Sequence, residues 1–324
     1  MPGSDSGVRL SRRAVLAGGA GLAAIACAAG GYELVRDGKL PGKYTLARMT
    51  GACGSGLPRP AGAPPSRHEA SFYSAYRWRR VQMVTLIPAG VASPRGLGVV
   101  IGLHGAGGTT VSMATNIAPS LTRARVPTFA VICVDGGETY WHEHADGDDP
   151  IGMIVHEVLP RAAAAGMQTA RIGVGGESMG GFGALLIAER LASPGARTSA
   201  GRPAPAAAMV AALSPAVFVT YEDAHAVNAA GFDSPANFAR NNVVSGLHAL
   251  RHVPAYVACG TDDPFAPETT LVRARLAALT QRPVPGGIMP GCHDSAFWGR
   301  HWPTALDLMG PRLGGPRSGH PTAA

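Results

Sequence analysis

The sequence of 324 residues predicts an α/β fold with a mostly parallel central sheet and helices on both faces. Short apolar runs alternate along the chain with longer segments of helical pattern. Several of these runs are apolar throughout, which is typical of strands that helices cover on both sides. Hydrophobic residues make up 46% of the chain and charged residues 15%, so the chain contains enough apolar material for a sizeable core.

Most of the expected strands end in turns that contain Gly or Asp. The expected strands cover residues 80–87, 97–103, 128–134, 171–175, 207–213, 255–258 and 284–289. Helices are expected over residues 151–165, 179–191, 267–280 and 295–309. Short polar helical pieces in residues 220–252 interrupt the alternation, so we expect a small cap there.

The first thirty residues have the pattern of an export signal. Ser11-Arg12-Arg13 precedes an uncharged run rich in Gly and Ala, which fits a twin-arginine signal peptide. We expect residues 1–30 to be this signal, residues 31–70 a lead-in, and residues 71–324 the α/β domain. The twin-arginine export machinery would then be a partner, and the protein would be secreted or associated with the cell envelope.

Two other interpretations of this N-terminal segment stay open. The uncharged run could be retained as an anchor helix. Alternatively, Cys27 could be lipidated, because the preceding Ala24-Ile25-Ala26 loosely matches a lipoprotein box.

Charge and residue spacing argue against nucleic acids, metals and cofactors as partners. The net charge is +7, but the arginines are dispersed and form no basic stripe. No C-x-x-C pair is present, and residues 140–149, although rich in His and Asp, match neither H-E-x-x-H nor an EF-hand loop. We expect Asp148 or Asp149 to cap the next helix, and Trp141 to line a substrate cleft.

The strongest chemical signal is the G-E-S-M-G sequence of residues 176–180. An apolar strand precedes it and a helical segment follows it, as in a nucleophile elbow. Small residues on either side of the central serine allow a strained turn that exposes the hydroxyl at the sheet edge. The sequence therefore predicts Ser178 as a nucleophile rather than part of a phosphate-binding turn.

A serine nucleophile needs a base, and the base needs an acid to orient it. The chain order expected for this architecture is serine, acid, histidine. His293 follows the last expected strand and precedes the terminal helix, so we assign it as the base. Asp263 stands directly before a proline and is preferred as the acid, with Asp262 as the alternative.

An oxyanion formed at Ser178 would need backbone N–H donors. One is expected from Met179, which follows the nucleophile. The other is expected from the glycine-rich loop of residues 104–108, where Ala106 is the first choice and Gly107 the second.

Five segments together resemble one known family. They are Leu103-His-Gly-Ala-Gly-Gly108, Asp135-Gly-Gly with Tyr140-Trp141, Glu177-Ser-Met-Gly-Gly-Phe-Gly-Ala184, Cys259-Gly-Thr-Asp-Asp-Pro-Phe265 and Gly291-Cys-His-Asp294. They resemble the esterase family that includes S-formylglutathione hydrolases of the esterase D type and the mycobacterial mycolyltransferase antigens. The resemblance covers residues 70–310, and the sequence is similar to exported actinobacterial members of the family. It implies an α/β-hydrolase fold, no metal, and hydrolysis of carboxylic esters or acyl transfer.

Three functions follow, in order of preference. The first is an exported serine esterase that acts on a small-molecule or lipid ester through an acyl-enzyme. The second is an acyltransferase that acts on cell-envelope glycolipids with the same residues. The third is a non-catalytic adhesin, which the full set of Ser178, Asp263 and His293 disfavours.

Export would permit a disulfide, and the expected strand order suggests which cysteines form it. Cys259 and Cys292 end strands that we expect to be parallel neighbours, so we predict that they are bonded. Two buried free thiols are the alternative, and Cys133 is expected to be free in either case.

Overall fold

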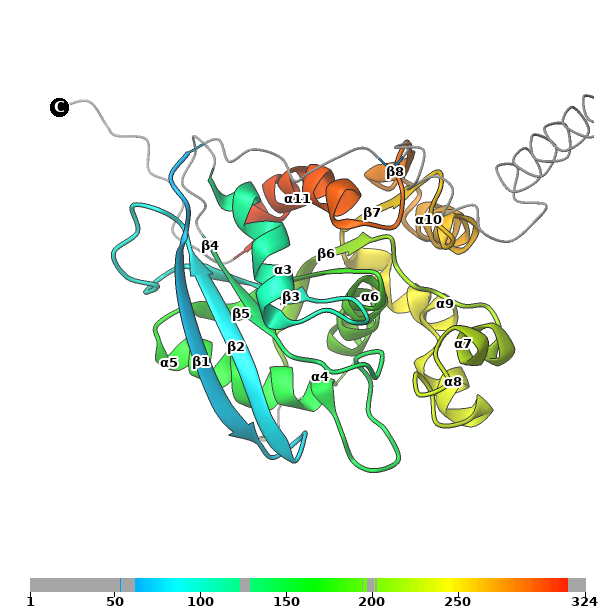
Figure 1. The fold of residues 1–324 in the computed structure, drawn as a ribbon, viewed down its shortest axis with the longest axis horizontal. Coiled ribbons are helices and arrows are strands. Elements are labelled where there is room, and N and C mark those ends of the chain that lie inside the picture. Colours follow the sequence, from blue (N-terminus) through cyan, green and yellow to red (C-terminus); the bar gives the residue numbers. More distant parts are fainter. Residues whose placement is uncertain are drawn as a thin grey trace, which may run out of the picture. The chain divides into compact units, whose positions relative to one another are not determined.

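The computed structural model describes Cys53 and residues 62–122, 129–193, 195–196, 201 and 203–313 (Figure 1). The predicted signal peptide, Cys27 and most of the predicted lead-in lie outside these residues. Among the described residues, helices long and apolar enough to cross a membrane are absent.

The centre of the fold is an eight-stranded sheet in the order β1-β2-β4-β3-β5-β6-β7-β8 (Figure 1). The first two strands run antiparallel to their neighbours, and the remaining strands are parallel. The strands are β1 (Ser66–Ser74), β2 (Arg79–Ile87), β3 (Gly98–Leu103), β4 (Phe129–Val134), β5 (Gln168–Glu177), β6 (Ala206–Leu213), β7 (Ala255–Gly260) and β8 (Gly286–Met289). The predicted mostly parallel α/β sheet is therefore confirmed.

Helices cover both faces of the sheet. The helices that pack on it are α3 (Thr110–Ile117), α5 (Leu159–Ala164), α6 (Met179–Ala192), α10 (Ala266–Thr280) and α11 (Ser295–Met309). Residues of α3 and α11 pack on one face, and residues of α5, α6 and α10 pack on the other. This arrangement explains why β3 and β4 are buried along their whole length and why their sequences are apolar throughout.

The structure differs from the prediction at one helix, which is divided into three pieces, and at one strand, which was not predicted. The helical pattern of residues 151–165 forms α4 (Pro150–Met153), a π-helical turn η2 (Ile154–Val158) and α5. As expected for Asp149, its side chain caps this segment by accepting a hydrogen bond from the Gly152 N–H at 2.8 Å. Strand β1 falls partly in the predicted lead-in, and most of its residues are exposed, so it lacks the apolar pattern that revealed the inner strands.

The segment between β6 and β7 consists of short helices, as its interrupted pattern indicates. They are α7 (Tyr221–Val227), α8 (Pro235–Asn241), α9 (Val243–Gly246) and the 3-10 helix η3 (Leu247–His252). Two stacked histidines connect this segment to the loop after β4, since His142 Nε2 lies 2.8 Å from the Gly231 carbonyl and His144 Nδ1 lies 2.7 Å from the Asp233 carboxylate. The polar residues that resembled a metal cluster in the sequence thus bind protein oxygens.

A buried carboxylate in α6 is held in an apolar environment. Glu189 packs against Gly246, where an added Cβ would lie 2.1 Å from its Oε2 atom. Its Oε1 atom is buried and has no hydrogen-bond partner. Burial raises the pKa of Glu189 to about 9, so the carboxyl group is protonated at neutral pH.

We predict that Glu189 makes stability fall as pH rises. The unfolded chain releases the Glu189 proton near its ordinary pKa of 4.5, whereas the folded protein keeps it until about pH 9, so alkali favours unfolding between these values. Glu189→Gln should remove this effect and be more stable than the wild type at pH 8 by about 2 kcal/mol or more. Denaturant unfolding at pH 5 and pH 8 measures it, and equal pH dependence in the two proteins would contradict the assignment.

Candidate active site

A strained turn between β5 and α6 presents Ser178. Ser178 has φ 57° and ψ −120°, a conformation that residues other than glycine rarely adopt. The flanking glycines are required because the turn is closely packed. A Cβ at Gly176 would lie 2.1 Å from the Gly180 carbonyl oxygen, and a Cβ at Gly180 would lie 2.1 Å from the Leu103 carbonyl oxygen. The G-E-S-M-G sequence therefore forms the tight strand-to-helix turn that its spacing predicts.

A continuous hydrogen-bond chain joins Ser178, His293 and Asp263. His293 Nε2 lies 2.8 Å from Ser178 Oγ, and His293 Nδ1 lies 2.9 Å from Asp263 Oδ2. The Asp263 side chain is fully buried, and its other oxygen accepts a hydrogen bond from the Phe265 N–H at 2.9 Å. The structure thus brings together a hydroxyl, an imidazole and a carboxylate that are widely separated in the sequence.

The neighbouring Asp262 accepts a hydrogen bond from another residue. Its Oδ2 accepts a hydrogen bond from Thr261 Oγ1 at 3.1 Å, whereas His293 contacts the carboxylate of Asp263. Of the two aspartates considered in the sequence analysis, the geometry therefore favours Asp263 as the partner of the imidazole.

The glycine-rich loop after β3 lies against Ser178. A Cβ at Gly105 would be 3.0 Å from Ser178 Cβ and 3.6 Å from Ser178 Oγ. The Gly107 N–H donates to both carboxylate oxygens of Glu138, at 2.8 and 2.9 Å, and the Gly108 N–H donates to the Gly105 carbonyl. These bonds occupy the Gly107 and Gly108 amides, and this favours Ala106 over Gly107 as an oxyanion donor.

Met179 stands where a second backbone donor is needed. It is the first residue of α6, and the N–H groups of a helix's first turn have no partner within the helix. The helix dipole also favours negative charge at this end. Ala106 and Met179 therefore remain our candidates for the backbone donors.

Trp141 does not line a substrate cleft, and the sequence-based assignment is wrong. Its side chain is 0% exposed, and its indole N–H donates to the His104 carbonyl at 3.3 Å. The ring occupies space left by two glycines, since a Cβ at Gly136 or Gly183 would lie 2.4 or 2.5 Å from it. Trp141 instead supports the glycine-rich loop from inside the protein.

The predicted Cys259–Cys292 disulfide is also wrong. Cys292 is bonded to Cys53, with a Cα–Cα distance of 4.9 Å, and Cys259 is a buried free cysteine. The reason is register: Cys259 lies opposite Ile288 in the β7–β8 ladder, and Cys292 comes after that ladder ends. Cys133 is free, as expected.

Among the described residues, one group of side chains has the spacing of a metal site, and the disulfide lies within it. Cys53, Cys292 and Asp294 lie close together, but the two sulfurs are bonded to each other. Sequence reasoning missed Cys53 because it lies far from the strand-end motifs.

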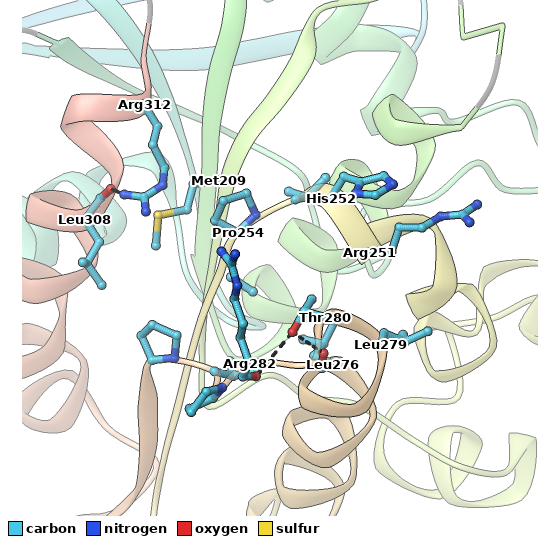
Figure 2. Close-up of a pocket in the computed structure, with 15 residues that line it drawn as sticks. Met209, Arg251, His252, Pro254, Leu276, Leu279, Thr280, Arg282, Leu308 and Arg312 are labelled. Atoms are coloured by element: carbon cyan, nitrogen blue, oxygen red, sulfur yellow. Dashed lines mark hydrogen bonds between the residues drawn. The ribbon is translucent and has the colours of Figure 1, made fainter.

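A separate hollow of about 580 Å³ lies where strands β7 and β8 begin, at their amino ends (Figure 2). Pro254 and Ala255 line it where β7 begins, and Arg282 and Arg312 are among its polar lining residues. Ser178, Asp263 and His293 all follow the carboxyl ends of their strands. The hollow is therefore distinct from the hydrogen-bonded chain at Ser178.

Comparison with known proteins identifies the fold. No protein-family model matches the chain, and no curated protein matches it. Solved structures do match. A ferulic acid esterase has a TM-score of 0.60 at 15% sequence identity, and the match covers 76% of this chain and 98% of that one. The substrate-bound fluorophosphonate-binding serine hydrolase FphF of Staphylococcus aureus has a TM-score of 0.60 at 17% identity, with 76% and 99% covered.

An S-formylglutathione hydrolase from Agrobacterium tumefaciens is also similar, with a TM-score of 0.59 at 16% identity, and the match covers 78% of this chain and 99% of that one. Agreement over nearly the whole length of these enzymes shows that the chain has the α/β-hydrolase fold predicted from the sequence resemblance.

We predict that the Cys53–Cys292 disulfide stabilises the protein. It joins cysteines 239 positions apart, for which the chain-entropy model gives about 5–6 kcal/mol. Cys53→Ser should therefore lower the midpoint of thermal unfolding markedly, whereas reductant should lower that of the wild type but not that of the variant. Cys259→Ser, which keeps the disulfide, is the matched control.

Peptide mapping of the unreduced protein tests the same assignment directly. A peptide that links Cys53 to Cys292 is expected, with Cys259 alkylated after denaturation. A peptide that links Cys259 to Cys292 would contradict it.

Proposed function

We propose that the protein is a serine hydrolase of carboxylic esters that works through an acyl-enzyme. The observation that carries this proposal is the hydrogen-bonded chain from Ser178 through His293 to Asp263, built on a strained turn. The esterases among the structurally similar proteins support the same reaction class. Their low sequence identity is evidence for the fold, so the assignment of activity rests on the geometry of these residues.

In the proposed acylation, each of these side chains has one role. His293 Nε2 accepts the Ser178 hydroxyl proton as Oγ attacks the ester carbonyl. The carbonyl oxygen becomes negatively charged and accepts hydrogen bonds from the Met179 and Ala106 amides. The His293 imidazolium then donates its proton to the leaving alkoxide, which departs as an alcohol and leaves the acyl group on Ser178. The buried Asp263 carboxylate holds the ring orientation and stabilises the imidazolium.

Deacylation repeats these steps with water. His293 removes a proton from the water as the water oxygen attacks the acyl carbonyl. The tetrahedral intermediate then collapses, the His293 imidazolium returns its proton to the departing Ser178 Oγ, and the carboxylic acid is released. A sugar hydroxyl in place of water would give acyl transfer instead, with the same residues. We propose hydrolysis as the main reaction. Product analysis with trehalose present distinguishes the two, since transfer would yield an acylated sugar.

We also propose that the protein is exported, as its N-terminal sequence predicts. The Cys53–Cys292 disulfide supports this proposal, because disulfides persist in oxidising compartments and are rare in the cytosol. Export through the twin-arginine pathway would deliver the protein already folded.

The triad assignment predicts a ranked series of variants. Ser178→Ala and His293→Ala should each lower kcat by on the order of 10⁴, since neither group works without the other. Asp263→Asn should lower kcat less than either, and Asp262→Asn is the matched control with little expected effect. Initial rates on p-nitrophenyl esters of several acyl lengths measure the series. Greater damage from Asp262→Asn than from Asp263→Asn would show that the acid is misassigned.

The export proposal predicts an effect of the arginine pair. Arg12→Lys with Arg13→Lys should trap the precursor in the cytoplasm, because the arginine pair is the feature that marks a twin-arginine signal. Fractionation followed by immunoblotting measures the mature protein outside the cytoplasm. A variant secreted as well as the wild type would point to a general secretory signal or an anchor.

A further inference from the structure

A carboxylate is buried directly beneath the nucleophile. Glu177 is the last residue of β5, immediately before Ser178, and is 2% exposed. The mechanism proposed above does not use it. An ionised carboxylate in this position is costly, because burial removes its hydration. An apolar side chain of similar volume would fill the space without that cost, so the carboxylate needs an explanation beyond packing.

Two helices donate hydrogen bonds to this carboxylate. The Trp302 indole N–H of α11 donates to Oε1 at 2.6 Å, and the Asn116 side-chain amide of α3 donates to Oε2 at 2.8 Å. Burial raises the pKa of Glu177 to about 7, and these two donors oppose that rise. Each carboxylate oxygen of Glu177 thus accepts a hydrogen bond from a different helix, Oε1 from α11 and Oε2 from α3.

Each of these two helices follows a loop to which we assign a catalytic role. Helix α3 begins at Thr110, just after the loop that contains Ala106, and α11 begins at Ser295, two residues after His293. Glu177 itself is covalently joined to Ser178. One carboxylate thus connects the nucleophile, the backbone donor and the base.

Trp302 has little room to move in response to a change at Glu177. It is fully buried, and a Cβ at Gly175 would lie 2.8 Å from its ring, so the indole packs directly against β5. The hydrogen bond to Glu177 therefore fixes the position of α11 relative to the strand that bears the nucleophile.

We propose that Glu177 is a positioning residue, whose carboxylate holds α3 and α11 at fixed positions relative to Ser178. The inference rests on the proposed function of Ser178 and His293. Displacements of about 1 Å in a catalytic arrangement cost on the order of 100-fold in rate. Loss of both hydrogen bonds should therefore lower the rate of chemistry and leave the binding of the substrate nearly unchanged.

The expected effect separates kcat from KM. Glu177→Ala should lower kcat about 10- to 100-fold, with KM changed less than about threefold. Glu177→Gln should retain most of the activity, because its carbonyl can accept from Trp302 while its amide donates to the Asn116 side-chain oxygen after that amide turns. Trp302→Phe keeps an aromatic ring and removes one donor, but the smaller ring also loses part of the packing against Gly175, so an intermediate loss is expected.

The experiment measures kcat and KM on a p-nitrophenyl ester, normalised to active sites titrated with a fluorophosphonate. The rate of fluorophosphonate labelling is a second readout, since it reports on Ser178 without deacylation. Glu189→Gln is the matched control, because it alters another buried glutamate that faces α9 instead of the catalytic helices. If Glu177→Ala does not fold, Glu177→Gln and Trp302→Phe carry the test.

The outcomes distinguish this inference from the proposed function. Unchanged kcat per titrated site in Glu177→Ala and Trp302→Phe, with Ser178→Ala inactive, would overturn the positioning role alone. Equal losses in Glu177→Gln and Glu177→Ala would also overturn it, because the charge rather than the hydrogen bonds would then be required. Full activity in Ser178→Ala would overturn the proposed function itself.

Discussion

The backbone of Ser178 is the constraint on which the rest of the site depends. Its positive φ is unfavourable for a residue with a Cβ, and it persists because hydrogen bonds fix it on both sides. The Ser178 N–H donates to the Leu213 carbonyl at 2.9 Å, and the Ser178 carbonyl accepts from the Phe182 N–H at 3.1 Å and the Ala216 N–H at 3.0 Å. The end of β6 and the first turn of α6 therefore hold the turn together. Because the backbone is not free to relax, the Ser178 hydroxyl stays within hydrogen-bond distance of His293.

Backbone hydrogen bonds align the loops that carry Asp263 and His293, and Cys259 and Cys292 form no disulfide between their strands. The Thr261 N–H donates to the Met289 carbonyl at 2.8 Å, and the Asp262 N–H donates to the Gly291 carbonyl at 2.9 Å. The pairing of β7 with β8 thus continues past the strand ends into the loops that carry Asp263 and His293. The disulfide at Cys292 instead attaches a distant segment of the chain to the base loop.

The sequence was informative where function and local structure require the same residues. Parallel strands place their carboxyl ends at one sheet edge, so the order of Ser178, Asp263 and His293 was enough to anticipate that they meet. The fold followed from the buried strands for a similar reason, since burial on both faces demands apolar runs. Register and long-range contacts leave no such pattern. The pairing of Cys53, the burial of Trp141 and the two donors to Glu177 depend on tertiary packing.

In the loop after β4, residues that stabilise the structure have a sequence pattern like that of a functional site. Its aromatic, His and Asp residues suggested a cleft or a metal site, but in the structure they hold the loop in place. Arg77 is 1% exposed, pairs with Asp148 at 2.6 Å and donates to the Asp135 carbonyl at 2.6 Å. Trp141 then packs beneath the glycine-rich loop. A backbone amide can stabilise an oxyanion only if it is already aimed at the reacting atom, so these buried polar and aromatic contacts would support the proposed role of Ala106 by fixing a loop that has few side chains of its own.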